Sequence, residues 1–390
     1  MEITHIDCFS GPGGICTGFH AAGIHTLAAI ESIQSCVDTY RANHPEVHVI
    51  HSDIRDVGAE RILPFIPADG VDLVSSGMPC ETFSTAGNTS RSFYDDRQLL
   101  FREGIRIAKM TNAKMILFEN VPAITTKTVE RGAKELVVDL LKRELAAAGY
   151  ENYIEVVLNA ANYGVPQRRN RFFILAARNA NWKLSAPLPT HSAEVTVSEA
   201  FAGLPNIVPN TKTEGKAYTN DSSAFSELMR DNAFWRLGQG TNNEITYQTP
   251  MKHRACTLER FALLRQGESL KDLFERYDGK EREALQARRV LPKKMFIKRN
   301  HRLALNEPSP TVTSHCLDEF VHPLYDRALT VRECARLQSF PDCYDFAGGP
   351  FIVPHIERTV QDKYEQIGDA VPPLLAYAWG KHIIDILGGE

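Results

Sequence analysis

The first 180 residues alternate short apolar runs with amphipathic stretches, and this alternation limits the possible folds more than any other feature. The pattern is typical of βα units wound around a mainly parallel sheet. We therefore predict an α/β fold. The expected strands are residues 3–9, 26–31, 47–52, 71–76, 114–119, 153–159 and 171–176. The expected helices are residues 14–22, 33–43, 99–110 and 129–148, the last of them ended by Gly149.

The remainder of the chain differs in amino-acid composition. Residues 187–279 are rich in Pro, Asn, Thr and Gly and predict a separate, loop-rich region. Residues 280–302 carry nine basic side chains against two acidic ones, which indicates either a solvated helix or a phosphate-binding face. Residues 364–387 predict an apolar helix with Pro372 and Pro373 near its start.

Composition narrows the class of protein. The chain has 390 residues, of which 43% are hydrophobic, enough for two domains or one enlarged domain. No apolar run reaches membrane-spanning length and the first residues do not resemble a signal peptide, so we expect a soluble intracellular protein. The eight cysteines are scattered without a Cys-x-x-Cys pair, which suggests neither a disulfide framework nor a zinc site, and no metal is expected.

A glycine-rich turn and two acids follow the first three expected strands. Residues 9–14 read Phe-Ser-Gly-Pro-Gly-Gly, a turn that allows backbone to approach a ligand closely. Glu31 and Asp53 end the second and third strands, about where a ribose-binding carboxylate is expected. The set predicts an adenosine ligand and leaves NAD and S-adenosylmethionine open. The phosphate-binding motif of nucleoside triphosphatases is missing.

Side chains that could take part in a reaction follow the later strands. Residues 77–80 read Gly-Met-Pro-Cys, and they place Cys80 where an α/β sheet exposes its active site. Taken alone, Cys80 is more often a small buried hydrophobe than a nucleophile. Glu119 ends the fifth strand, and the period of two in residues 167–171 puts Gln167, Arg169 and Arg171 on one face. A thiol, a carboxylate and guanidiniums on one rim favour covalent attack on an electron-poor ring over hydride transfer.

These motifs, in this order, resemble those of the C5-cytosine DNA methyltransferases, and the resemblance covers nearly the whole chain. The matching segments are residues 9–14, Glu31, Asp53, 77–80, 119–121, 167–171, 327–342 and 366–373. Glu81 and Asp369 depart from the family pattern, which commonly has Gln and Asn there. The resemblance implies a Rossmann-like S-adenosylmethionine-dependent methyltransferase fold, a mixed, mostly parallel sheet with helices on both faces, plus a smaller loop-rich target-recognition domain.

The resemblance also implies a domain organisation and a mechanism. Residues 1–184 would form the catalytic and cofactor-binding domain, 185–325 the target-recognition domain, and 326–390 a segment that completes the catalytic domain. Cys80 would add to C6 of a cytosine flipped out of the duplex, under a loop formed by residues 83–98. The other expected catalytic residues are Glu119 near N3, Arg169 on the cytosine carbonyl oxygen, and Arg171 supporting the nucleophile and the acid.

The resemblance names the ligands as well. The cofactor would be S-adenosylmethionine, released as S-adenosylhomocysteine, and bound by Phe9, Ser10, Gly11, Gly13, Gly14, Glu31, Ser32, Asp53, Ile54, Pro79, Leu100, Asp369 and Val371. The substrate would be duplex DNA with a short recognition sequence, contacted by Ser84, Arg97, Gln167, Lys293, Lys294, Lys298 and Arg299. We expect a bacterial cytoplasmic enzyme, nucleoid-associated through DNA and monomeric on it, beside a separately acting restriction endonuclease.

Three alternatives remain open from the sequence. The same chemistry on tRNA is disfavoured by the long recognition region. An NAD-dependent oxidoreductase on the same fold would leave Cys80, Glu119 and the arginines unexplained. A catalytically inactive DNA-binding protein is disfavoured by the intact nucleophile and acid.

Overall fold

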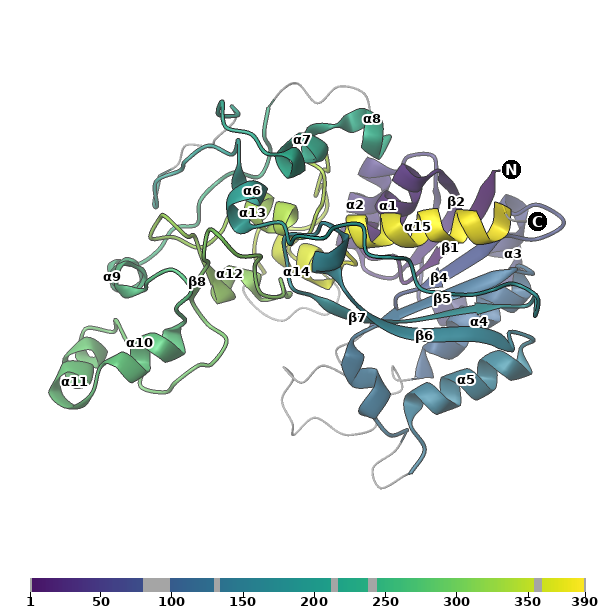
Figure 1. The fold of residues 1–390 in the computed structure, drawn as a ribbon, viewed down its shortest axis with the longest axis horizontal. Helices are drawn as coiled ribbons and strands as arrows, with labels where there is room; N and C mark the ends of the chain where they lie inside the picture. The colour runs from purple at the N-terminus through teal and green to yellow at the C-terminus, as the bar shows by residue number, and fades with distance from the viewer. Residues whose placement is uncertain are drawn as a thin grey trace.

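A seven-stranded sheet lies at the centre of the computed structural model, which describes residues 2–79, 99–129, 134–211, 217–237, 244–353 and 360–388 (Figure 1). Its strands are β1 (Ile3–Cys8), β2 (Ile24–Glu31), β3 (His48–His51), β4 (Leu73–Ser76), β5 (Met115–Asn120), β6 (Asn152–Asn159) and β7 (Asn170–Ala177). Each of the seven expected strands is confirmed to within two residues at either end. Buried strands read as short, nearly continuous apolar runs, which is why the pattern located them.

The sheet is mixed and mostly parallel, as predicted. The strand order is β3-β2-β1-β4-β5-β7-β6, and β7 runs antiparallel to both β5 and β6. The chain moves outward from β1 in one direction and then returns to place β4 on the other side of β1. Ligands of doubly wound folds bind at such a reversal, beyond the carboxyl ends of the strands. The fold therefore points to the loops that follow β1 and β4.

Helices cover both faces of the sheet (Figure 1). One face packs against α1 (Gly14–Ala22), α2 (Gln34–Asn43) and α15 (Pro373–Gly388), and the other against α3 (Ala59–Ile62), α4 (Phe101–Met110) and α5 (Val137–Ala147). The last helix, α15, lies along α1 near the beginning of the chain. Gly18 permits this approach, because a Cβ there would lie 2.2 Å from the carbonyl oxygen of Pro373.

Two helix predictions need correction. The helix expected at 129–148 is α5 and begins only at Val137, because Thr128 pairs with Leu136 in an antiparallel bridge. The helix expected at 364–387 is interrupted: α14 (Lys363–Asp369) ends before Ala370, which is extended with φ −66° and ψ 152°. Two consecutive prolines at 372 and 373 explain the break, since a proline lacks the amide hydrogen and disfavours helix at the residue before it.

The middle of the chain forms a lobe beside the sheet, built from short helices (Figure 1). They are α6 (Val197–Phe201), α7 (Ala224–Arg230), α8 (Asn232–Trp235), α9 (Ala255–Leu263), α10 (Leu270–Arg276), α11 (Gly279–Ala287), α12 (Cys316–Glu319) and α13 (Val331–Leu337). A two-stranded sheet joins β8 (His301–Arg302) to β9 (Phe320–Val321). Across the described ranges, none of the helices is long and apolar enough to cross a membrane.

Candidate active site

The loops after β1, β2, β3, β4 and β5 converge at the carboxyl edge of the sheet. Backbone hydrogen bonds join them: Ser10 N–H donates to the Ile30 carbonyl at 3.2 Å, and Gly77 N–H to the Cys8 carbonyl at 3.3 Å. The ends of β2 and β3 are joined in the same way, because Ser52 N–H donates to the Glu31 carbonyl at 3.0 Å. The expected cofactor and catalytic motifs therefore lie next to one another.

The turn after β1 has an unusual backbone. Phe9 adopts φ +56°, Gly11 φ +53° and Gly13 φ +97°. A bulky residue in the left-handed region costs free energy and is found where the surrounding structure imposes it, often at functional sites. A Cβ on Gly14 would lie 2.3 Å from the carbonyl oxygen of Val371, so this turn also packs directly against the segment between α14 and α15.

Glu31 is held in one orientation by three backbone amides. Gly11 N–H donates to Oε2 at 2.8 Å, and the amides of Ser32 and Ile33 donate to Oε1 at 2.7 and 2.8 Å. Burial raises the pKa of Glu31, and these backbone hydrogen bonds oppose the rise. The carboxylate is pre-oriented at the ligand edge and keeps acceptor capacity for hydroxyl groups.

Two features beside Glu31 suit a bound adenosine group. The buried Ser10 hydroxyl has no hydrogen-bond partner within the described part of the chain. A Cβ placed on Gly11 would meet no atom within 4 Å, so this side of the turn borders open space. An unsatisfied buried hydroxyl, an oriented carboxylate and an open glycine face fit the donors and acceptors of a ribose. The residues present therefore fit the cofactor that the sequence predicts.

The remaining expected cofactor residues differ in how far they are buried. Asp53 caps the short 3-10 helix after β3 and pairs with Arg55, and Arg106 of α4 donates to the Ile54 carbonyl at 2.6 Å. Asp369 is exposed at the end of α14 and accepts a hydrogen bond from Gln361 at 2.9 Å. Ser32, Pro79 and Leu100 are partly or fully exposed at the same edge.

Glu119 and Arg171 form a nearly buried ion pair at the ends of β5 and β7. Arg171 Nε lies 2.8 Å from Glu119 Oε1, and the two side chains are 10% and 11% exposed. Burial raises the pKa of Glu119, while Arg171 and Arg169 oppose that rise. Glu119 Oε2 lies 3.7 Å from the position of a Cβ on Gly77, three residues before Cys80 in the chain. A carboxyl group with a raised pKa therefore faces the start of the cysteine loop, where it can donate a proton.

Asn120 supports this loop in a way that the sequence did not predict. Its amide Nδ2 donates to the Met78 carbonyl at 3.2 Å, and its Oδ1 accepts from Val121 N–H at 2.8 Å. The side chain is buried, so the two hydrogen bonds tie the end of β5 to the backbone just before Pro79. The position of Asn120 next to Glu119 was visible in the sequence, but its partner in the loop after the neighbouring strand β4 was not.

The prediction that Gln167 contacts DNA is wrong, because its side chain is completely buried. Its amide nitrogen donates to the Leu337 carbonyl at 3.0 Å and to Gln338, and its oxygen accepts from Val312 N–H at 2.8 Å. The predicted alternation is confirmed, since Gln167, Arg169 and Arg171 are buried while Arg168 is exposed. Gln167 thus joins β7 to the segments around Val312 and α13 and has no surface to offer DNA.

Arg169 also differs from its expected role on the cytosine carbonyl. Its guanidinium donates to the backbone carbonyls of Val312, Gly368 (2.8 Å) and Ala370 (3.2 Å), and the residue is 1% exposed. These bonds hold the segment between α14 and α15, which carries Val371, against the start of β7. Arg169 is therefore a positioning residue, whereas Arg171 is the arginine that touches Glu119.

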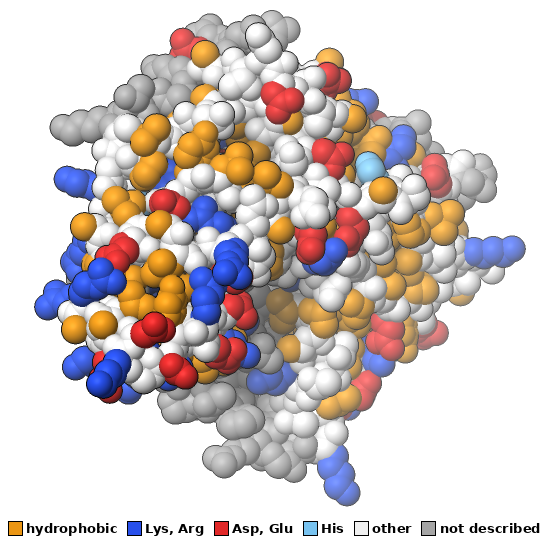
Figure 2. Space-filling model, turned by 60° about the vertical axis from the view of Figure 1, so that its left-hand side comes forward, with side chains coloured by type: hydrophobic (Ala, Val, Ile, Leu, Met, Phe, Trp, Pro, Cys, Tyr) orange, Lys and Arg blue, Asp and Glu red, His pale blue; other side chains and the backbone are white. Residues whose placement is uncertain are grey.

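The other expected DNA contacts fall into two groups, and the expected nucleophile belongs with the first. Cys80, Glu81, Ser84, Arg97 and the loop at 83–98 lie outside the described residues. Lys293, Lys294, Lys298 and Arg299 are exposed, beside an exposed Phe296 and an Ile297 that is 69% exposed. Figure 2 shows the lobe brought forward, with Lys and Arg side chains gathered over it among acidic and apolar ones. The basic group remains available to a polyanion.

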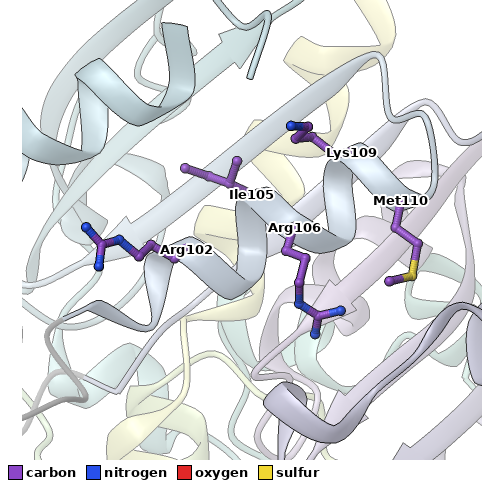
Figure 3. A pocket seen from close by; sticks show the side chains of 5 residues that line it. All are labelled: Arg102, Ile105, Arg106, Lys109 and Met110. Carbon is purple, nitrogen blue, oxygen red and sulfur yellow. The ribbon is translucent and has the colours of Figure 1, made fainter. Parts of the chain in front are cut away.

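A shallow pocket on α4 is separate from this site. It is lined by Arg102, Ile105, Arg106, Lys109 and Met110. All five come from one helix, with Ile105 and Lys109 on one side and Arg106 and Met110 on the other (Figure 3). Side chains that diverge around a single helix do not enclose a ligand, so the carboxyl edge of the sheet remains the candidate active site.

Comparisons with known proteins relate nearly the whole chain to one family. A family model described as C-5 cytosine-specific DNA methylase matches residues 3–385. The chain is 32% identical over 384 residues to the type II methyltransferase M.DdeI of Desulfomicrobium norvegicum, covering 97% of this chain and 88% of that protein. It is 31% identical over 391 residues to M1.HphI of Haemophilus parahaemolyticus, covering 100% and 89%. A solved DNA modification methyltransferase encoded within an E. coli prophage superposes with a TM-score of 0.72 at 25% identity, covering 99% of this chain and 100% of that one.

Proposed function

Since the chain belongs to the C-5 cytosine-specific DNA methylase family, we propose that it methylates C5 of one cytosine in a short duplex DNA sequence through a covalent Cys80 intermediate. The enzyme class, a cytosine-5 DNA methyltransferase of the type II restriction-modification kind, follows from the family and from the relatives. The observation that supports the mechanism is the buried Glu119–Arg171 pair beside the start of the cysteine loop.

The proposed chemistry begins at the thiolate. C5 of cytosine is a poor nucleophile, and addition of the Cys80 thiolate to C6 makes C5 enamine-like. Glu119 donates a proton to N3 as negative charge develops there, and Arg171 holds the carboxyl group in place. After C5 has taken the methyl group, the Glu119 carboxylate takes back the N3 proton, and transfer of the C5 proton to a water molecule expels the thiolate and restores the aromatic ring. The base must leave the helix for this attack, because C6 and C5 are unreachable in a stacked duplex.

S-Adenosylmethionine supplies the electrophilic methyl group in this reaction. The residues proposed to hold the cofactor are Glu31 at the ribose, Ser10 and Gly11 in the turn, and Val371 beside Gly14. Phe9, Gly13, Ser32, Asp53, Ile54, Pro79, Leu100 and Asp369 complete the proposed site. The backbone amides around Glu31 fix the carboxylate before binding, which reduces the free energy needed to organise the site.

The lobe supplies the proposed DNA contacts. We assign target recognition to residues 185–325 and completion of the catalytic domain to 326–390, in line with the packing of α15 on α1. Lys293, Lys294, Lys298 and Arg299 would contact phosphates, and Ser84 and Arg97 would contact the DNA at the flipped base. The enzyme would act as a monomer in the bacterial cytoplasm, near the nucleoid, and a separate restriction endonuclease would cut the unmethylated sequence.

Replacing Lys293 and Lys294 together by alanine should weaken DNA binding and reduce its salt dependence. Each phosphate contact contributes about 0.9 to the slope of log affinity against log salt, so the slope should fall by up to about 1.8. Fluorescence anisotropy of a labelled duplex across a salt series would measure it. The matched control replaces Lys109 and Lys183, two exposed lysines outside the lobe, and should leave the slope unchanged. An equal slope in both double variants would contradict the assignment.

Methyl transfer itself is tested on two nucleic acids. With S-adenosylmethionine present, the purified chain should methylate duplex DNA from an unmodified host and leave tRNA unmodified. Bisulfite sequencing of DNA from an expressing host should then show one short sequence protected at a fixed cytosine. Preferential methylation of tRNA would replace the DNA proposal, and modification of neither would reject both.

A further inference from the structure

Three side chains near the C-terminal ends of α1 and α2 converge on a single point. His20 lies in the last turn of α1, His44 directly follows α2, and Glu46 lies two residues further on. The Nδ1 atoms of His20 and His44 lie 3.6 and 3.8 Å from the same carboxylate oxygen, Glu46 Oε1. The three ligand atoms lie within 4.8 Å of one another.

The hydrogen bonds on the far side of each ring fix its tautomer. The Thr17 hydroxyl donates to the Gly13 carbonyl at 2.8 Å, so its oxygen can only accept at the 3.1 Å contact with His44 Nε2. His20 Nε2 lies 3.1 Å from the carbonyl oxygen of Arg236, which also can only accept. Each Nε2 therefore carries a hydrogen, which leaves the Nδ1 atom of each ring to face Glu46.

One nitrogen of this group is buried without a hydrogen-bond partner among the described residues. His44 is fully buried, and none of the described residues hydrogen-bonds its Nδ1, because 3.8 Å is too long for such a bond. A cation between the two ring nitrogens and the carboxylate oxygen would give this buried nitrogen a partner and would attract the carboxylate.

We propose that His20, His44 and Glu46 bind a zinc ion. Two imidazoles and one carboxylate form a ligand set that zinc accepts, with water in the fourth position. Zinc–ligand bonds of about 2.0–2.1 Å in a tetrahedron place neighbouring ligand atoms about 3.3 Å apart. The distances of 3.6 and 3.8 Å exceed that value by a few tenths of an ångström, and the two ring nitrogens, within 4.8 Å of each other, would also move closer when the ion binds. The Glu46 side chain is 38% exposed, so an ion can enter from solvent.

The outer hydrogen bonds suggest what the ion does. Metal-bound histidines are usually oriented through their second nitrogen, and here these partners are Thr17, which bonds Gly13 of the cofactor turn, and Arg236 of the lobe. Zinc would join the end of α1 to the end of α2 and stabilise the packing around the turn. The role is structural and independent of methyl transfer.

Zinc binding by the full, untagged chain tests this inference. Titration against a chromophoric chelator should give one equivalent of Zn²⁺ per chain, and Co²⁺ should give the visible bands of a tetrahedral site. His20→Ala and Glu46→Gln should each weaken the affinity at least 100-fold. Both side chains are partly exposed, so these variants should fold even where His44→Ala does not. Zinc should also raise the melting temperature of the parent chain but not of these variants.

His25→Ala is the matched control. His25 Nδ1 also faces a carboxylate, Glu2 Oε1 at 4.0 Å, but that exposed pair is not part of the three-ligand group. The variant should bind zinc like the parent chain. Binding of less than one equivalent by the parent chain, or unchanged affinity in His20→Ala and Glu46→Gln, would overturn the proposal and leave a proton as the occupant.

Discussion

Replacing Cys80 by serine is expected to abolish methyl transfer and to remove the covalent complex with DNA. A serine hydroxyl is far less ionised than a thiol near neutral pH and attacks C6 poorly. The loss should be about 10⁴-fold or more, as for removal of the nucleophile in other covalent enzymes. Methyl transfer from labelled S-adenosylmethionine to duplex DNA would measure the rate.

Trapping separates this prediction from a simple loss of binding. In duplex DNA with 5-fluorocytosine at the target, methylation leaves fluorine where the proton must depart, so the adduct cannot be resolved. The parent chain should form a complex that survives denaturation, and Cys80→Ser should not. Cys256→Ser changes a different thiol, which is partly exposed, and should trap like the parent chain. No adduct from the parent chain at any sequence, with cofactor present, would reject the covalent mechanism.

The strand pattern predicted the sheet well, because strands covered on both faces must be apolar along their length. The same logic located the site, since strands β1 to β5 are parallel and their carboxyl ends meet at one edge. Helix starts were less accurate. Residues 128 and 129 belong to a bridge with the segment before α5, and nothing local marks that pairing.

Side-chain roles in residues 167–171 could be predicted only in part. The period of two correctly put Gln167, Arg169 and Arg171 on one face, which the structure shows to be buried. It could not say what each would meet there, because their partners come from distant segments such as Val312 and Gly368. The group of His20, His44 and Glu46 escaped the sequence for the same reason, since only the packing of α1 against α2 brings two distant histidines together.

Glu119→Gln is expected to lower the methyl-transfer rate by about 10²- to 10⁴-fold while DNA binding persists, the range typical for removal of a general acid. The amide oxygen can still accept from Arg171 Nε, so the local structure should survive, but the amide has no proton to give N3. Glu144→Gln alters a carboxylate paired with Arg102 on the surface and should leave the rate unchanged.

The pH profile distinguishes an acid from a merely structural carboxylate. Burial raises the pKa of Glu119, against the opposing charges of Arg171 and Arg169, so its proton persists to higher pH than on an ordinary glutamate. The parent rate that depends on this proton should fall as pH rises through the raised pKa, whereas the residual rate of Glu119→Gln should lack that decline. A variant within about threefold of the parent rate, with the same pH profile, would exclude the general-acid role. Removal of a general acid lowers the rate by about 10²-fold or more. If instead the rate and DNA affinity fell together, the pair with Arg171 would be holding the edge of the sheet rather than donating a proton.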